Sequence, residues 1–361
     1  VQSVGTLDSE FEDYRKHARE GRSIRFGEGD RETTLRLLQV WQKHQLREGV
    51  LDDAWLTQGA LLAVKSLGRV PEELRFRCVL IDEYQDFSSL ELELLRRIPT
   101  ATADGLFLTG DQAQRVHTKH LDFERAGLST IERRRIRKNY RNSREILEAG
   151  QKLLERYCAV ESARQAGVTI VQPEFAARHS ARPFSCQSND PIRASWAYAE
   201  EWIAAGNPPF SVCIVTTSLG SFNIESVLAR KPAHLRGNRL SGDYMHDVEA
   251  VVVSDAASVK GFEFSLIIAI GLDEGQFPQS GAVEAEHWRD ALRLYVTITR
   301  ARDELRFIYC GTPSPFLNAM ADATEPRTLF FEEVASILTE HRLSLIHISE
   351  PTRLRRISYA V

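Results

Sequence analysis

The sequence predicts an α/β protein whose strands run mainly parallel. Residues 78–81 and 105–109 are short apolar segments that indicate strands, and Ser88 or Ser89 is suited to begin a helix between them. Parallel neighbours need a long crossover, so strand, helix and strand at this spacing form a βαβ unit. Alternating helices and strands between residues 194 and 309 predict a second layer of the same kind.

Helices are expected in the first part of the chain from the spacing of its apolar residues. Residues 34–46 and 52–67 each place apolar side chains on one helical face. The helix of the βαβ unit carries Leu90, Leu94 and Ile98 at helical spacing. The first seventy or so residues are therefore predicted to be mostly helical.

The later part of the chain is expected to contain the second α/β layer. A looser stretch with Pro173, Pro183 and Pro191 is predicted to be a connector. The elements expected after it are a helix at 194–204, strands at 212–216, 250–254, 266–270 and 305–309, and a helix at 290–299.

Composition narrows the class of protein. Hydrophobic residues make up 43% of the 361 and charged residues 27%, as in soluble globular proteins. No apolar run approaches the ~20 residues that cross a bilayer, and the five cysteines form no CxxC pair. We expect a cytoplasmic protein without a membrane partner. The net charge of −4 means that any surface for nucleic acid must be local.

Two adjacent carboxylates follow the first apolar strand, in the run Asp82-Glu83-Tyr84-Gln85-Asp86. The carboxyl end of a strand is where α/β sheets bind ligands. In nucleotide triphosphatases one acid holds Mg²⁺ and another group orients or deprotonates the attacking water. The alternative is a solvated acidic loop without a role. The sequence contains no Gly-x-x-x-x-Gly-Lys-Ser/Thr phosphate loop.

A second polar motif closes the neighbouring strand. Gly110-Asp111 suits a tight turn, and Gln114 follows at a distance from which an amide reaches a phosphate. The alternative is a turn that ends the strand, with an incidental glutamine.

A basic run between residues 133 and 144 contains an aromatic residue beside an arginine. Tyr140 is suited to stack on a base, and Arg141 to bind a phosphate in bidentate fashion. The alternative is a solvated basic segment, which is the usual meaning of a run of like charges.

Two charged residues flank later elements. Glu263 lies just before the strand at 266–270, where the alternative is a plain turn. Arg300 directly follows the helix at 290–299, and an arginine at that place can cross an interface to a γ-phosphate. The alternative is that Arg300 and Arg302 interact with the dipole at the carboxyl end of that helix.

Taken in order, these motifs resemble those of the UvrD/Rep/PcrA-like family of superfamily-one DNA helicases. The resemblance covers roughly residues 50–312. It implies two RecA-like parallel-sheet domains with ATP between them. We expect a partial first domain at 1–132, truncated at its N-terminus and carrying a helical insertion. A second domain is expected at 133–342, with a tail at 343–361 that does not look native.

The resemblance also implies a role for each motif residue. The expected roles are Mg²⁺ ligand for Asp82, general base for Glu83, γ-phosphate sensor for Gln114, adenine stacking for Tyr140, γ-phosphate contact for Arg141, ribose contact for Glu263 and arginine finger for Arg300.

The implied function is an ATP-dependent DNA helicase or translocase, 3′→5′, acting on single-stranded DNA or single/double-strand junctions. The missing phosphate loop predicts a fragment that does not hydrolyse ATP by itself. The alternative is a non-hydrolysing, helicase-like module that binds DNA or docks a partner. The third alternative is the helicase part of a fused helicase–nuclease whose nuclease lies outside this chain.

Overall fold

The computed structural model describes residues 27–100, 104–111, 114, 121–134, 136, 138–157, 174, 176–217, 222–240, 248–279 and 284–331. The expected tail at 343–361, the beginning of the first domain and the arginines at 135 and 137 lie outside these ranges. Among the described residues, no helix is long and apolar enough to cross a membrane.

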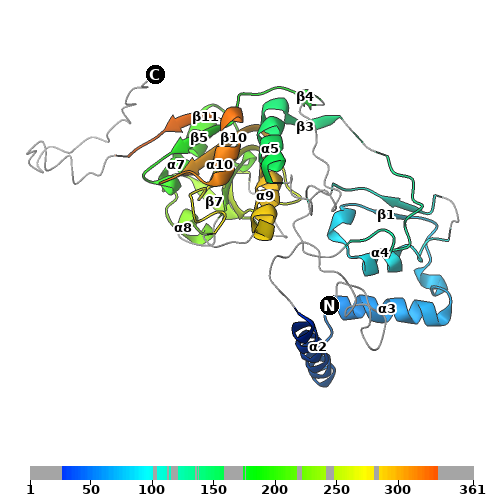
Figure 1. The fold of residues 1–361 in the computed structure, drawn as a ribbon. Coiled ribbons are helices and arrows are strands. Elements are labelled where there is room, and N and C mark those ends of the chain that lie inside the picture. The colour runs from blue at the N-terminus through cyan, green and yellow to red at the C-terminus, as the bar shows by residue number, and fades with distance from the viewer. Residues whose placement is uncertain are drawn as a thin grey trace, which may run out of the picture.

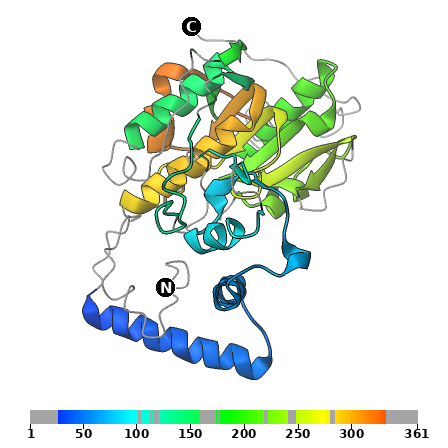
Figure 2. The same cartoon turned by 90° about the vertical axis from the view of Figure 1, so that its right-hand side faces the viewer.

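Among the described residues, two α-helices precede the first sheet. They are α2 (Glu28–Glu48) and α3 (Asp53–Leu67), and both views place them at the end of the molecule away from the largest sheet (Figures 1 and 2). The Asp52 carboxylate caps α3 by accepting a hydrogen bond from the Trp55 N–H at 2.8 Å. Both helices were predicted, although α2 begins before the expected residue 34.

The predicted βαβ unit is present. Strand β1 (Val79–Ile81) pairs in parallel with β2 (Leu106–Leu108), and α4 (Ser89–Leu95) connects them. Helix α4 is shorter than expected and ends before Ile98. Its buried leucines are Leu90 and Leu92, and Leu92 packs in the small core around Ile81.

A seven-stranded parallel sheet forms the second unit (Figure 1). Its strand order is β11-β5-β10-β9-β6-β8-β7, and all neighbours are parallel. The strands are β5 (Phe184–Gln187), β6 (Val212–Thr216), β7 (Arg236–Arg239), β8 (Ala250–Asp255), β9 (Phe264–Ile270), β10 (Ala301–Tyr309) and β11 (Glu325–Thr328).

Helices cover both faces of this sheet. On one face α5 (Arg144–Tyr157), α9 (Glu284–Thr299) and α10 (Pro315–Ala319) pack on one apolar cluster. On the other, α7 (Pro191–Ala204) and α8 (Ile224–Ala229) pack on a second cluster. Burial on both faces explains the continuous apolar runs of the central strands. The α/β class with parallel sheets is therefore confirmed, whereas the boundary between residues 132 and 133 stays a prediction.

The predicted connector was wrong in part. Strand β4 (Ala176–Arg178) pairs in parallel with β3 (Asn139–Ser143), and β5 belongs to the main sheet. Helix α7 begins at Pro191 itself, capped by Asp190, because proline at the first helical position lacks only an N–H that has no helical partner. Pro183 thus directly precedes β5, and Pro191 is the first residue of α7.

Candidate active site

The two adjacent carboxylates lie at the carboxyl end of β1, as the sequence indicates. The Asp82 Oδ1 atom accepts hydrogen bonds from the Thr109 hydroxyl and, at 2.9 Å, from the Glu83 N–H. The hydroxyl is the larger cause and the N–H the smaller in lowering the pKa of Asp82 below its ordinary value of 3.8. Asp82 is therefore an exposed carboxylate that is ionised at neutral pH.

Asp82 fits the binding of Mg²⁺. Its Oδ2 atom accepts no hydrogen bond from any described residue, and charged oxygen is the ligand that Mg²⁺ prefers. The described residues contain no group of three or more His, Cys, Asp or Glu that is suited to hold a metal. A site here would combine one carboxylate with water and phosphate oxygens, which is how Mg²⁺ is commonly held.

Gln85 holds the loop that carries Glu83. It is fully buried, its Nε2 donates to Glu83 Oε2, and its Oε1 accepts from the Asp111 N–H at 3.0 Å. A Cβ on Gly110 would lie 2.1 Å from Gln85 Oε1, so the turn after β2 needs glycine there. Gln85 lies inside the acidic motif, residues 82–86, but its position in the sequence predicted no role for it. The sequence signal for its role was the nearby Gly110-Asp111 turn, against which Gln85 packs.

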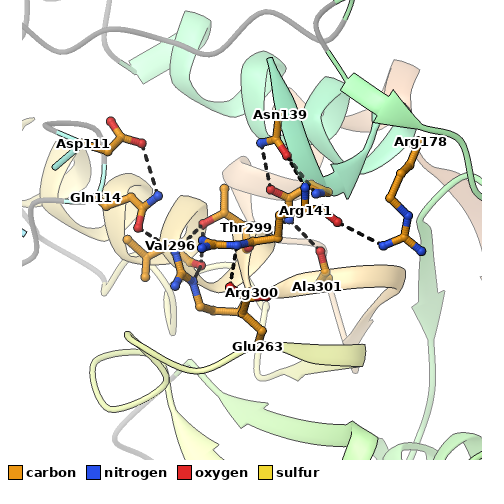
Figure 3. Close-up of polar contacts among 11 residues, drawn as sticks. Asp111, Gln114, Asn139, Arg141, Arg178, Glu263, Val296, Thr299, Arg300 and Ala301 are labelled. Carbon is orange, nitrogen blue, oxygen red and sulfur yellow. Dashed lines mark hydrogen bonds and ion pairs between the residues drawn. The ribbon is translucent and has the colours of Figure 1, made fainter. Parts of the chain in front are cut away.

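Gln114 and Arg300 join the unit of β1 and β2, which carries the acidic motif, to the unit of the seven-stranded sheet. Arg300 Nη2 donates to Gln114 Oε1 at 2.6 Å, and Gln114 Nε2 donates to Asp111 Oδ2 at 3.2 Å (Figure 3). Arg300 is only 2% exposed, and its Nε donates to the Val296 carbonyl at 3.3 Å. It therefore also satisfies the carboxyl end of α9, as the alternative interpretation expected.

The charges around Arg300 come from both units. Burial and then the charge of Arg141 lower the pKa of Arg300, while Glu83, Glu263 and Asp111 raise it. Arg300 stays protonated at neutral pH despite this lowering, because the ordinary pKa of an arginine lies far above 7. Arg300 is thus a buried cation within the electrostatic reach of the acidic motif.

Arg141 and Glu263 bind each other. Their Nε and Oε1 atoms are 2.6 Å apart, and both side chains are about two-fifths exposed, at 41% and 39%. Tyr140 is 67% exposed, and its ring lies 5.1 Å from Lys138 Nζ. Among the described residues no hydrogen bond or ion pair joins the acidic motif directly to Arg141.

A second contact between the units was not predicted. Lys260 Nζ lies 2.7 Å and 2.5 Å from the two carboxylate oxygens of Asp86, and the lysine side chain is only 12% exposed. Asp86 ends the acidic motif, and Lys260 lies three residues before Glu263. The Lys-Gly pair ahead of Glu263 was visible in the sequence, but the sequence did not indicate that Lys260 binds Asp86.

Comparison with known proteins identifies the family. The chain matches the UvrD/REP helicase N-terminal domain over residues 10–134 and the UvrD-like helicase C-terminal domain over residues 235–312. Both matched regions hold residues of the site described above. The chain belongs to the UvrD/Rep-like helicase family.

Curated relatives match short segments. The chain is 45% identical over 56 residues to the ATP-dependent DNA helicase Rep of Buchnera aphidicola, which covers 15% of this chain and 8% of that protein. It is 31% identical over 77 residues to the ATP-dependent DNA helicase Rep of Salmonella typhimurium, covering 21% of this chain and 11% of that protein. The matches thus span about a tenth of those relatives.

A solved structure of the C-terminal domain of a possible DNA helicase from Lactobacillus plantarum is also similar. It is 15% identical, with a TM-score of 0.38, and the match covers 53% of this chain and 98% of that one.

Proposed function

We propose that this chain works within an ATP-dependent DNA helicase or translocase that moves 3′→5′ on single-stranded DNA. The observation that carries the proposal is the hydrogen bond between Gln114 and Arg300, because it links the unit with the acidic motif to the unit with the arginines. The direction of movement comes from the family resemblance alone.

The acidic motif supports the chemistry of phosphoryl transfer to water. Asp82 would hold Mg²⁺, whose role when bound is to neutralise phosphate charge. Glu83 would orient and deprotonate the attacking water. Its carboxylate is fixed for this task by Gln85, which is anchored in turn by the Asp111 N–H.

The cationic groups come from the second unit. Arg141 and Arg300 would stabilise the charge that develops on the γ-phosphate, which is the main demand of this reaction. Arg141 would exchange Glu263 for a phosphate oxygen, leaving Glu263 for the ribose. Tyr140 would offer its exposed ring to the adenine, since flat aromatic faces stack on bases.

Coupling to DNA follows from dividing the site between two units. Gln114 would transmit the state of the phosphate site, because it contacts Asp111 in its own unit and Arg300 in the other. Closing and opening of the units would then move the single strand of DNA, which would be held through phosphate contacts and base stacking. Single/double-strand junctions are the expected substrates.

The test is ATP hydrolysis stimulated by single-stranded DNA. The 361 residues contain no phosphate-loop lysine, so we expect this chain by itself to hydrolyse no more ATP than its Glu83→Gln variant. In a longer polypeptide that also supplies a phosphate loop, we expect DNA-stimulated turnover that Glu83→Gln reduces by about 100-fold or more.

The rival function is a module that binds DNA or a partner without hydrolysis. The ion pair between Arg141 and Glu263 favours it, because each group already has a partner within the chain. If DNA binding by the longer polypeptide is sensitive to salt but indifferent to MgATP, and Glu83→Gln changes nothing, the helicase proposal is wrong.

A further inference from the structure

The side chain of Asn142 is a buried amide between the strand that carries Arg141 and the backbone around Arg300. Asn142 is only 2% exposed. Its Nδ2 donates to the carbonyl of Thr299 at 2.8 Å and to that of Ala301 at 2.7 Å. One amide therefore binds the carbonyls immediately before and after Arg300.

The orientation of this amide follows from its partners. Both backbone partners are acceptors, so the NH₂ group must face them, and an NH₂ group has two protons to donate. The Oδ1 atom of Asn142 accepts from Asn139 Nδ2 at 3.1 Å. Asn142 thus uses both donors and one acceptor at a buried position, where an unmade hydrogen bond is costly.

The backbone of Arg300 is held from two sides. The Arg300 carbonyl accepts from the Phe264 N–H of β9 at 3.0 Å, while Asn142 binds the flanking carbonyls from β3. Thr299 ends α9, so its carbonyl lies beyond the helical ladder and needs an outside donor. From this anchored backbone the Arg300 side chain reaches Gln114 (Figure 3).

The same strand fixes Arg141. Successive residues of a strand point to opposite faces, so Asn142 points inward while Arg141 reaches Glu263. The Arg141 N–H donates to Asn139 Oδ1 at 2.9 Å, and its carbonyl accepts from Arg178 Nη1 at 3.2 Å. The backbones of both arginines are therefore tied to one hydrogen-bonded network (Figure 3).

We propose that Asn142 is a positioning residue that fixes Arg141 and Arg300 relative to one another. The two guanidinium groups repel each other, and a neutral amide ties their backbones together without adding charge. The need for a fixed placement of the two arginines rests on the proposed function, because misplacing a group by about 1 Å is enough to slow a reaction strongly. The contacts themselves do not depend on nucleotide or DNA.

The test is the exchange of the Arg300 Nε proton with solvent, followed by NMR in the full chain. This proton is buried and bonded to the Val296 carbonyl, so it exchanges slowly. Asn142→Asp keeps the shape but turns acceptors toward the two carbonyls. We expect exchange at Arg300 to become at least about tenfold faster.

Two controls separate positioning from general loosening. Asn207→Asp makes the same chemical change at an asparagine that donates to the Trp202 carbonyl, and should leave Arg300 unchanged. Within each variant, the Arg306 Nε proton, bonded to Glu304, serves as the internal reference.

If circular dichroism reports that Asn142→Asp is unfolded, Asn142→Ser replaces it, because a shorter side chain with one donor cannot bind both carbonyls. Faster exchange at Arg300 with an unchanged Arg306 supports the proposal. Unchanged exchange at Arg300, or an equal increase at Arg300 and Arg306, overturns the proposal. Neither result depends on ATP hydrolysis, so the helicase proposal stands or falls separately.

Discussion

Two neighbours of Asp82 favour its ionised form. The Thr109 hydroxyl and the Glu83 N–H both bind its Oδ1 atom, and both favour the ionised form. Because the folded pKa of Asp82 lies below its ordinary value, this contact stabilises the fold above about pH 4. The contribution is lost as the pH falls through the lowered pKa.

Thr109→Val should raise the pKa of Asp82 toward its ordinary value of 3.8, because valine has the shape of threonine without its hydroxyl. Thr109→Ser keeps the hydroxyl and is the matched control. An NMR titration of the Asp82 carboxyl carbon measures both. If Asp82 titrates at the same pH in the valine variant and the wild type, the Thr109 hydroxyl does not lower the pKa of Asp82.

A set of candidate site residues could be proposed from the sequence, but most of the contacts of these residues could not. The order of the motifs marked Asp82, Glu83 and Arg300 as a set. The partner of Arg300 lies 186 residues away at Gln114, and no local pattern connects them. Gln85 and Asn142 were also missed, because a buried amide is recognised by the groups around it rather than by its own sequence position.

At the scale of elements, apolar periodicity predicted the interior and failed at the edges. Strand β6 was predicted at its observed bounds, because all five of its residues are buried. The edge strands β7 and β11 are largely polar and exposed, and β11 contains Pro326, so only pairing with the sheet makes them strands. Helix α5 was overlooked, although Ile146, Leu153 and Leu154 show its period.

Helix α4 depends on its first turn. Ser88 Oγ accepts from the Glu91 N–H at 3.3 Å, and the Ser88 N–H donates to Glu91 Oε2 at 2.6 Å, which is a capping box. Ser88→Ala should cost about 1 kcal/mol, so the amides of α4 should exchange about fivefold faster.

Hydrogen exchange at the α4 amides measures this effect. Ser66→Ala, a serine in the exposed part of α3, is the control and should leave α4 unchanged. Equal exchange in the Ser88 and Ser66 variants would mean that packing on the core, rather than the cap, holds the helix.

At the scale of the whole molecule, two polar contacts among the described residues cross between the units near the acidic motif. Gln114 binds Arg300, and Asp86 binds Lys260. Asp86 ends the acidic motif, and Gln114 is connected to that motif through Asp111 and Gln85. Lys260 lies in the segment before β9, and Arg300 directly follows α9. These contacts connect the acidic motif to the unit of the seven-stranded sheet, as the proposed coupling of hydrolysis to movement requires.

The most direct test of this account is the effect of Arg300→Ala on DNA-stimulated ATP hydrolysis in the longer polypeptide that supplies a phosphate loop. Arg302→Ala is the matched control, since Arg302 is exposed and lies two residues further on. We predict that Arg300→Ala lowers kcat by about 100-fold or more, as expected for an arginine finger, while Arg302→Ala has little effect. Equal turnover in the two variants would contradict the claim that Arg300 completes the site from the second unit.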